Sequence, residues 1–484
     1  MATVSRGYPF SFYSVEPVAY SESEQKLVSA FLDLVYRRLS VDDFCAQAGM
    51  KDCEALDSFV NSIDDTKIGK PVSQEDFERF GKNVREFCSQ FDVDAAKVAK
   101  SVADSVYGYR VVQPFFDDGD LEEIMINGAG TPIIVYHRQL GPCKTSLSFR
   151  NDRELSSFVA QISRATGEGR RVVFEDLRLP DKSRANISFP PATRETVITI
   201  RKFRKQPMTF VDLVRNGTVS AELAAFLWVC GDGMMLYPLN VLVVGGTASG
   251  KTTTLNALSA FVPPSERIIS IEDTLELNFA GRENWVAMES GTEEGLDGLL
   301  KNSLRMRPDR LIVGEVRGSE AETLFTAMNI GHRGTMGTLH ANSDRDAVKR
   351  LENAPMDVPR ALLPLVDVVV VQHRINDRRK GLLRRVTQVS EVSRIEDQIA
   401  LNEIYKWDPR EDEIYRTDST SESLEKLAKA TGSNVNALKE ELGRRRDLIK
   451  YLIERNISTP ADVAQFMQAY YSETTGQKKK EPAD

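Results

Sequence analysis

A glycine-rich segment that ends in a lysine and a threonine has the residue types needed to bind a triphosphate. It matches the pattern G-x-x-x-x-G-K-[ST] in full, after the apolar run 241–244 and before the helix-like run 253–258. Glycines let backbone N–H groups fold around phosphates, the lysine reaches the β- and γ-phosphates, and the threonine hydroxyl coordinates Mg²⁺. We expect ATP and Mg²⁺ to be bound here by Gly245, Gly246, Thr247, Ala248, Ser249, Gly250, Lys251, Thr252 and Thr253.

Two carboxylates that follow other apolar runs could complete a site for ATP hydrolysis. Glu315 follows the run 311–313, at the end of a strand where open α/β sheets bind ligands, so we expect it to hold Mg²⁺ directly or through a water. Several carboxylates in 272–276 follow the run 268–271, and among them we assign Glu276 as the base for the attacking water. Either glutamate alone could be a solvated residue at a strand end. The triphosphate loop upstream favours the catalytic interpretation.

Two of the four histidines, His332 and His340, lie in the glycine- and threonine-rich segment 331–340. Most single histidines are structural. A pair after a predicted sheet strand indicates a sensor that hydrogen-bonds the γ-phosphate or its water. Metal ligation is disfavoured because no cysteine or third histidine lies nearby.

Short apolar strands alternate with helical stretches between residues 220 and 395, and this alternation must position these side chains. Runs with both faces apolar are typical of a parallel sheet covered by helices on both sides. The fold class predicted for this part is therefore α/β. Its predicted strands are 241–244, 268–271, 311–313 and 368–371.

The rest of the chain divides into regions with different hydrophobic patterns. We expect an irregular arm over 1–20 within a mostly helical region, then an α+β domain with strands near 124–126, 133–136, 185–189 and 196–200, and finally a helical end with a polar tail. The expected boundaries are 1–105 (helical region), 106–204 (α+β domain), 205–219 (linker), 220–395 (ATPase domain) and 396–484 (C-terminal helical region).

Composition narrows the class of protein. The net charge is −8 and the pI about 5.4, which gives no global electrostatic reason to coat nucleic acid. The start has no apolar stretch of signal-peptide length and no run is long enough to span a bilayer, so we expect a cytoplasmic protein. Five cysteines without a CxxC pair favour reduced, buried thiols over a zinc site or a disulfide framework.

The order of these segments resembles that of the type II/IV secretion and type IV pilus ATPase superfamily. The matching segments are the P-loop, an Asp box (271–277), a Walker B box and a His box (331–342), and 304–317 fits the signature L-R-x-x-P-D-x-φ-φ-φ-G-E-φ-R, φ being aliphatic. The resemblance covers roughly residues 110–470.

The resemblance implies a RecA-like P-loop ATPase domain in a homo-hexameric ring. An N-terminal domain would close over the nucleotide, and a polytopic inner-membrane platform protein would be the partner. It also implies that Glu276 is the general base, that Glu315 holds the Mg²⁺-bound water, and that His340 lies near the γ-phosphate. Arg194 and Arg201 match the arginines that the N-terminal domain supplies, although a solvated basic surface is an equally good interpretation of each.

Gly318 is a residue that the type IV secretion, tight-adherence and archaeal branches of this superfamily share. Bacterial pilus and type II members usually carry aspartate there, and the bacterial tetracysteine module is missing from this sequence. The sequences of the P-loop, Walker B and His-box segments look most like those of the archaeal branch. Within that branch they look closer to pilus-assembly members than to the archaellum motor.

The leading hypothesis is therefore a Mg²⁺-dependent ATPase, associated peripherally with the cytoplasmic membrane, that powers pilus assembly or type II-like secretion. An archaellum motor is the nearest alternative. A nucleic-acid-translocating ring would need a basic channel or stacking aromatics, and no nucleic acid partner is expected. A small-molecule kinase is disfavoured because the flanking regions carry no acceptor-binding signature.

Overall fold

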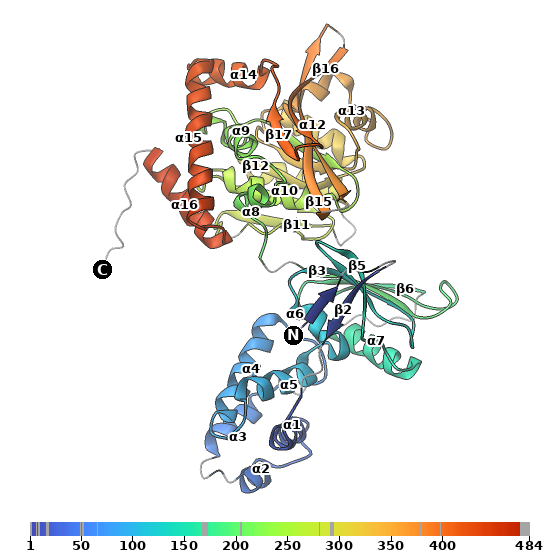
Figure 1. Cartoon of the computed structure of the whole chain (residues 1–484). Helices are drawn as coiled ribbons and strands as arrows, with labels where there is room; N and C mark the ends of the chain where they lie inside the picture. The colour runs from blue at the N-terminus through green and yellow to red at the C-terminus, as the bar shows by residue number, and fades with distance from the viewer. Residues whose placement is uncertain are drawn as a thin grey trace. The chain divides into compact units, whose positions relative to one another are not determined.

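The computed structural model of the 484-residue chain divides into two compact units, Met1–Arg204 and Lys205–Asp484. Figure 1 shows the helices and strands of each unit. The structure describes residues 2–5, 7, 10–15, 19–48, 50, 53–64, 66–166, 173–203, 206–279, 281–290, 295–377, 380–396 and 398–474. None of the helices in these ranges is long and apolar enough to cross a membrane.

Five helices form the first part of the first unit and bury a common apolar core that includes Phe31, Phe80 and Val102. Ser21 caps the first helix in a capping box with Glu24, and Asp94 caps the fifth. The amphipathic helix predicted after Ser21 is thus confirmed. The helices are α1 (Glu22–Val35), α2 (Val41–Ala48), α3 (Glu54–Asn61), α4 (Gln74–Cys88) and α5 (Ala95–Tyr107).

An eight-stranded sheet in the order β1-β2-β5-β4-β3-β8-β7-β6 forms the second part of this unit. Helix α7 (Asp152–Thr166) contributes Leu155 and Phe158 to an apolar core. The sheet contributes Ile124 and Ile200 to the same core. The four strands predicted in 124–200 are confirmed. The sheet consists of β1 (Ala2–Ser5), β2 (Ser11–Val15), β3 (Leu121–Asn127), β4 (Ile134–His137), β5 (Gly141–Thr145), β6 (Phe174–Arg178), β7 (Arg184–Ser188) and β8 (Val197–Arg201), with η1 (Arg110–Val112) and α6 (Gln113–Asp117) before it.

The prediction of an irregular arm over residues 1–20 was wrong, because β1 and β2 lie there. β2 pairs in parallel with β5, and Tyr13 is buried against Phe115 with its hydroxyl 2.5 Å from a carboxylate oxygen of Asp118. Aromatic residues favour strands where one face can be buried. The partner strand lies about 130 residues further on, so local pattern could not reveal the pairing.

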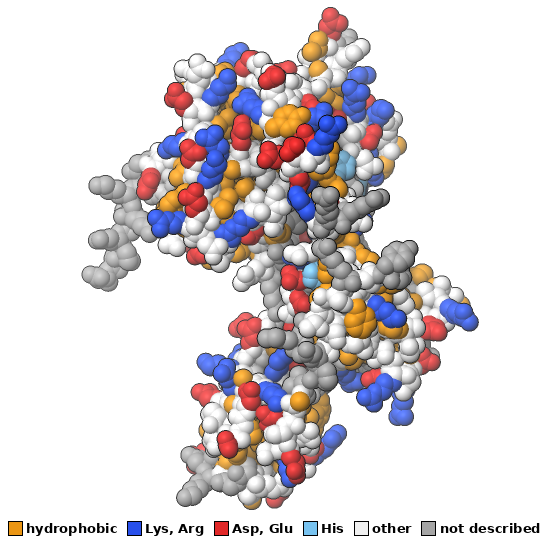
Figure 2. Space-filling view, in the orientation of Figure 1, with side chains coloured by type: hydrophobic (Ala, Val, Ile, Leu, Met, Phe, Trp, Pro, Cys, Tyr) orange, Lys and Arg blue, Asp and Glu red, His pale blue; other side chains and the backbone are white. Residues whose placement is uncertain are grey.

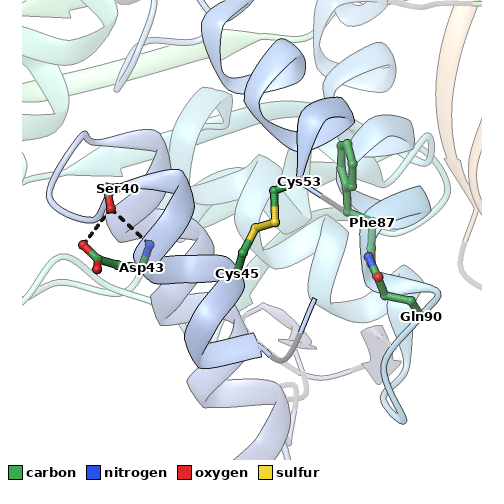
Figure 3. The surroundings of a disulfide bond; sticks show 6 residues. All are labelled: Ser40, Asp43, Cys45, Cys53, Phe87 and Gln90. Carbon is green, nitrogen blue, oxygen red and sulfur yellow. Dashed lines mark hydrogen bonds between the residues drawn. A yellow bond between two sulfur atoms is a disulfide. The ribbon is translucent and has the colours of Figure 1, made fainter. Parts of the chain in front are cut away.

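The prediction that all cysteines are reduced was also wrong. Cys45 on α2 and Cys53 just before α3 form a disulfide, with their Cα atoms 6.5 Å apart (Figure 3). The two cysteines lie eight positions apart in sequence, and their Cα separation is within the range that a disulfide can bridge. Cys88, Cys143 and Cys230 are free and buried, as expected for incidental thiols.

The second unit contains a nine-stranded sheet in the order β11-β10-β12-β13-β9-β14-β15-β16-β17. Neighbours from β11 to β14 pair in parallel, and β14 to β17 pair antiparallel. The predicted α/β parallel sheet is confirmed. The strands are β9 (Val241–Gly245), β10 (Ile268–Glu272), β11 (Trp285–Glu289), β12 (Arg310–Val316), β13 (Met336–Leu339), β14 (Val368–Asp377), β15 (Gly381–Ile395), β16 (Gln398–Asp408) and β17 (Glu413–Arg416).

Alternate residues of β9 face two separate cores, which explains why its sequence is apolar throughout. Val241 and Val243 pack in one core, Leu242 and Val244 in the other. Helices α8 (Phe210–Arg215), α9 (Ala221–Asp232), α10 (Lys251–Leu258), α14 (Glu422–Thr431), α15 (Val435–Glu454) and α16 (Pro460–Thr474) join the first core, with η2 (Gly233–Met235) and η3 (Ser259–Phe261). Helices α11 (Leu296–Ser303), α12 (Glu320–Asn329) and α13 (Asp344–Glu352), with η4 (Leu304–Met306) and η5 (Arg360–Leu365), join the second.

Two predicted boundaries of this unit were wrong. The sheet does not stop at 395: β16 and β17 extend it to Arg416, and helices resume only at α14. The expected linker 205–219 contains α8, whose Thr209–Asp212 capping box and buried Phe210 join it to the core. Half-buried hairpin strands and a six-residue helix both lack the long periodic pattern that sequence reading depends on.

Candidate nucleotide site

The P-loop lies between the central strand β9 and helix α10, which begins at Lys251. Ala248 and Gly250 have positive φ angles of 57° and 98°, so the loop turns tightly before the helix. A Cβ at position 245 would lie 2.2 Å from the carbonyl oxygen of Gln372, and only glycine fits so close to a neighbouring backbone. Gly245 and Gly250 are therefore required by the loop's geometry.

The neighbouring antiparallel strands hold this loop in place. The Thr254 hydroxyl on α10 donates to the side-chain oxygen of Gln372 on β14 at 2.8 Å. Arg384 on β15 donates from Nε to the carbonyl oxygen of Ala248 at 3.1 Å. Arg384 thus holds Ala248, a loop residue with a positive φ angle. It does so from β15, which lies two strands from β9 in the sheet.

A chain of contacts joins Lys251, His340 and Glu315. Lys251 Nζ lies 3.0 Å from the carbonyl oxygen of Gly246 and 3.4 Å from His340 Nδ1, and His340 Nε2 lies 3.0 Å from Glu315 Oε1. The three residues meet because β13 lies between β9 and β12, and parallel strands end at the same edge. The structure therefore brings together three of the residues predicted to form the site.

These contacts favour one tautomer of His340, because the Lys251 ammonium has only protons to donate. Its Nδ1 accepts from the Lys251 ammonium, which leaves the Nε2 proton to donate to Glu315. Burial, reinforced by the charge of Lys251, lowers the pKa of His340, and Glu315 opposes this only in part. His340 is therefore a neutral donor at neutral pH.

His332 does not join this group. It precedes β13, whereas His340 follows it, so the length of β13 separates the two rings. The interpretation of the two histidines as one sensor is not supported by this placement. His340 alone lies beside Lys251.

Glu276 lies in the loop after β10, and the backbone of this loop is bound by other side chains. Glu272, the last residue of β10, accepts from the N–H groups of Glu276 and Leu277, both at 3.0 Å. Asn256 on α10 accepts from the N–H of Asn278 at 2.7 Å. The Asp box is thus attached directly to the helix that begins at Lys251.

Glu272 is the buried member of this acidic group. Burial raises its pKa to about 7, although the two N–H groups act in the opposite direction. Glu272 is one of the carboxylates in 272–276, the segment in which the sequence favours Glu276 as the base. A signal for its burial was its place as the last residue of an apolar strand rather than the first of a loop.

The signature arginine links the Walker B strand to the Asp box. Arg317 forms an ion pair with Asp273, whose other oxygen accepts from the Ser290 hydroxyl at 2.8 Å. The N–H groups of Arg317 and Gly318 both donate to Glu320, at 2.6 and 2.8 Å. These contacts fix the segment that follows Glu315.

The two arginines predicted to act on the nucleotide belong to the first unit. Arg201 ends β8, and Arg194 lies in the turn before β8. A five-residue strand is about 13 Å long, so the two side chains start from opposite ends of β8. The structure does not bring them together.

Arg201 instead belongs to a row of arginines on one face of the sheet. Arg178 lies opposite Arg184 across β6 and β7, and Arg184 lies opposite Arg201 across β7 and β8. Directly opposite residues point to the same face and lie about 5 Å apart. We call these three residues the arginine row. Sequence reading missed Arg178 and Arg184 because only strand register places them beside Arg201.

The residues of the second unit fit ATP with Mg²⁺. The Ser249 hydroxyl is buried in the loop and has no hydrogen-bond partner among the described residues, as expected of a loop shaped around a polar ligand. The Thr252 hydroxyl and the Glu315 carboxylate are the hard oxygen donors that Mg²⁺ prefers. Lys251 supplies the positive charge for phosphates.

Several known proteins resemble this chain in sequence. Residues 121–447 match the family described as type II/IV secretion system protein. An uncharacterised protein of Methanocaldococcus jannaschii is 31% identical over 427 residues, which is 84% of this chain and 75% of the relative. A second from that organism is 43% identical over 232 residues, or 46% of this chain and 32% of the relative, so the chain spans about a third of its length. A probable conjugal transfer protein TrbB of Sinorhizobium fredii is 34% identical over 208 residues, 42% of this chain and 62% of the relative.

Proposed function

Because the chain belongs to the type II/IV secretion system protein family, we propose that it is a Mg²⁺-dependent ATPase that acts as the motor of a membrane-bound assembly machine. The observation that carries this proposal is the contact chain from Lys251 through His340 to Glu315 beside the P-loop. It joins a phosphate-binding cation to a carboxylate suited to Mg²⁺. The reaction is hydrolysis of ATP to ADP and phosphate.

Each residue of the site has a separate role in this proposal. Lys251 binds the β- and γ-phosphates, and Thr252 and Glu315 hold Mg²⁺, which when bound neutralises charge that develops on the phosphates. The Glu276 carboxylate accepts a proton from the attacking water. His340 donates its Nε2 proton to Glu315 and keeps that carboxylate oriented.

The arginine row provides the link from hydrolysis to movement. Arginine side chains can neutralise the charge that develops on a transferring phosphate. In our proposal the first unit closes on the bound triphosphate and reopens when phosphate leaves. Arg194, which the family resemblance implies, remains a further candidate.

We further propose a homo-hexameric ring that acts on a polytopic platform protein from the cytoplasmic side of a membrane. The filament or cargo would be that of an archaeal type IV pilus or a type II-like secretion system, with the archaellum motor as the nearest alternative. The two relatives from Methanocaldococcus jannaschii support the archaeal branch. The probable conjugal transfer protein supports a role in a transfer system.

A ring that translocates nucleic acid is the second candidate. On the face shown in Figure 2, basic and acidic side chains are interspersed over both units, and the net charge is −8. Neither feature favours binding to a phosphate backbone.

Phosphate release by the full chain tests the proposal. We expect Mg²⁺-dependent turnover that EDTA removes, that Lys251→Ala and Glu315→Ala abolish, and that single-stranded DNA does not change. Absence of turnover with Mg²⁺ and ATP would refute the ATPase assignment. Strong stimulation by DNA would replace the assembly motor with a nucleic-acid motor.

A further inference from the structure

Glu272 occupies a position that the proposed reaction does not yet use. It is only 3% exposed, and its Oε1 accepts from two consecutive N–H groups, those of Glu276 and Leu277. Its Oε2 makes no hydrogen bond to the described residues. A buried carboxylate thus binds the backbone of the residue assigned as the base.

The neighbouring Walker B strand leaves room for this side chain. β10 and β12 pair in parallel with Ile271 opposite Val313, so Glu272 lies beside Gly314. A Cβ at Gly314 would lie 2.8 Å from Cγ of Glu272. Glycine at this position lets the carboxylate pass between the strand end and the Asp box.

The loop that carries Glu276 depends on such side chains for its position. Residues 273–279 are neither helix nor strand, so no ladder of backbone hydrogen bonds fixes them. Glu289 offers a longer contact of 3.4 Å to the N–H of Leu275, and Asn256 binds Asn278 beyond the base. Among these contacts, that of Glu272 is made to Glu276 itself.

We propose that Glu272 is a positioning residue that holds the backbone of Glu276 so that its carboxylate faces the attacking water. The inference rests on the proposed ATPase function. A displacement of about 1 Å at a catalytic group can cost roughly 100-fold in rate, so losing this contact lowers kcat while the phosphate-binding loop remains intact. Glu272 itself touches neither water nor nucleotide in this role.

The test compares Glu272→Ala and Glu272→Gln in the full chain. Glutamine keeps the accepting oxygen and replaces only Oε2, so it rescues the contact. We expect Glu272→Ala to lower kcat by about 30-fold or more while the Kd for a fluorescent ATP analogue stays within about threefold, and Glu272→Gln to keep kcat within about threefold of wild type. Amide exchange in a peptide covering 273–279 rises in the alanine variant only.

Glu391→Ala is the matched control. Glu391 is also a buried glutamate of the second unit whose pKa burial raises, and it accepts from the Ser421 hydroxyl and the Glu422 N–H. It holds the start of α14, so its loss lowers stability without changing kcat by more than about threefold. Should Glu272→Ala unfold, Glu272→Asp replaces it, since a side chain one methylene shorter also loses the contact.

Three results would overturn the inference. These are wild-type kcat in the alanine or aspartate variant, equal loss of kcat in the alanine and glutamine variants, and equal loss in Glu391→Ala. If the wild type does not hydrolyse ATP, the proposed function fails, and the exchange measurement still reports whether Glu272 holds the loop.

Discussion

Burial shifts the pKa values of two side chains of the candidate site in opposite directions. The pKa of His340 is lowered by burial and by the Lys251 charge, and the pKa of Glu272 is raised by burial to about 7. A neutral histidine can donate to Glu315 while it accepts from Lys251. A glutamate that changes charge near pH 7 makes stability depend on pH.

Glu272→Gln therefore changes how stability varies with pH. The folded state raises the pKa of Glu272 from 4.5 to about 7, so its stabilising contribution is full below pH 4.5 and is lost as the pH rises through about 7. Glutamine carries no charge at any pH and escapes this loss. We expect the Tm of the variant, relative to wild type, to rise between pH about 5 and 8 in a nucleotide-free thermal melt. A difference that is constant over this range would contradict the burial of a titrating carboxyl.

The sequence could predict which residues surround Lys251 but not how they are supported. The P-loop pattern and the strand ends that carry Glu315 and His340 are local signals, and parallel strands bring them to one edge. The support from Glu272 depends on space beside Gly314. Glu272 and Gly314 lie on two strands that are about 40 residues apart in sequence. No local sequence pattern could therefore indicate this space.

At the scale of elements, helices and strands with a clear local hydrophobic pattern were predicted. Short strands that pair with distant parts of the chain were missed. The predicted runs belong to β9, β10, β12 and β14, whose alternate residues join a core on each side of the sheet; β11 and β13 were not among the predicted strands. β2 was missed because its partner β5 lies far along the chain. The same holds for β16 and β17, which alternate only in part because one face stays half-exposed.

The disulfide between α2 and α3 gives a prediction for the helical part of the first unit. Closing a loop of this size stabilises the folded state by about 2–3 kcal/mol through the unfolded chain. Cys45→Ser, or reduction of the wild type, should therefore speed amide exchange in peptides from α2 and α3. Further reductant should have no effect on the serine variant, which is the control. Unchanged exchange after reduction would show that the bond does not stabilise these helices.

The arginine row predicts which substitutions in the first unit slow hydrolysis. Arginines that neutralise a transferring phosphate contribute roughly 10³-fold or more to kcat. We expect Arg184→Ala and Arg201→Ala each to lower kcat by about 100-fold or more. Arg194→Ala, at the other end of β8, is the comparison and should cost far less. A larger loss for Arg194 than for Arg184 would favour the family-based assignment over the row.

At the scale of the whole molecule, the proposed hexamer predicts that nucleotide changes the oligomeric state. In the proposed ring, a variant that binds ATP without turnover should favour the closed state, because a ligand shifts an equilibrium toward the state that binds it. We expect Glu276→Gln with ATP and Mg²⁺ to have about six times the monomer mass by light scattering, and less without nucleotide. A monomer under both conditions would contradict the proposed hexamer.

The central claim is that Glu276, in the loop after β10, activates the water that hydrolyses ATP. The most direct measurement is ATP binding and phosphate release on one preparation of full-length Glu276→Gln, alongside wild type. We predict a Kd within about threefold of wild type and phosphate release lowered at least about 100-fold, since a general base contributes about 10²–10⁴-fold. Phosphate release at the wild-type rate would contradict the account.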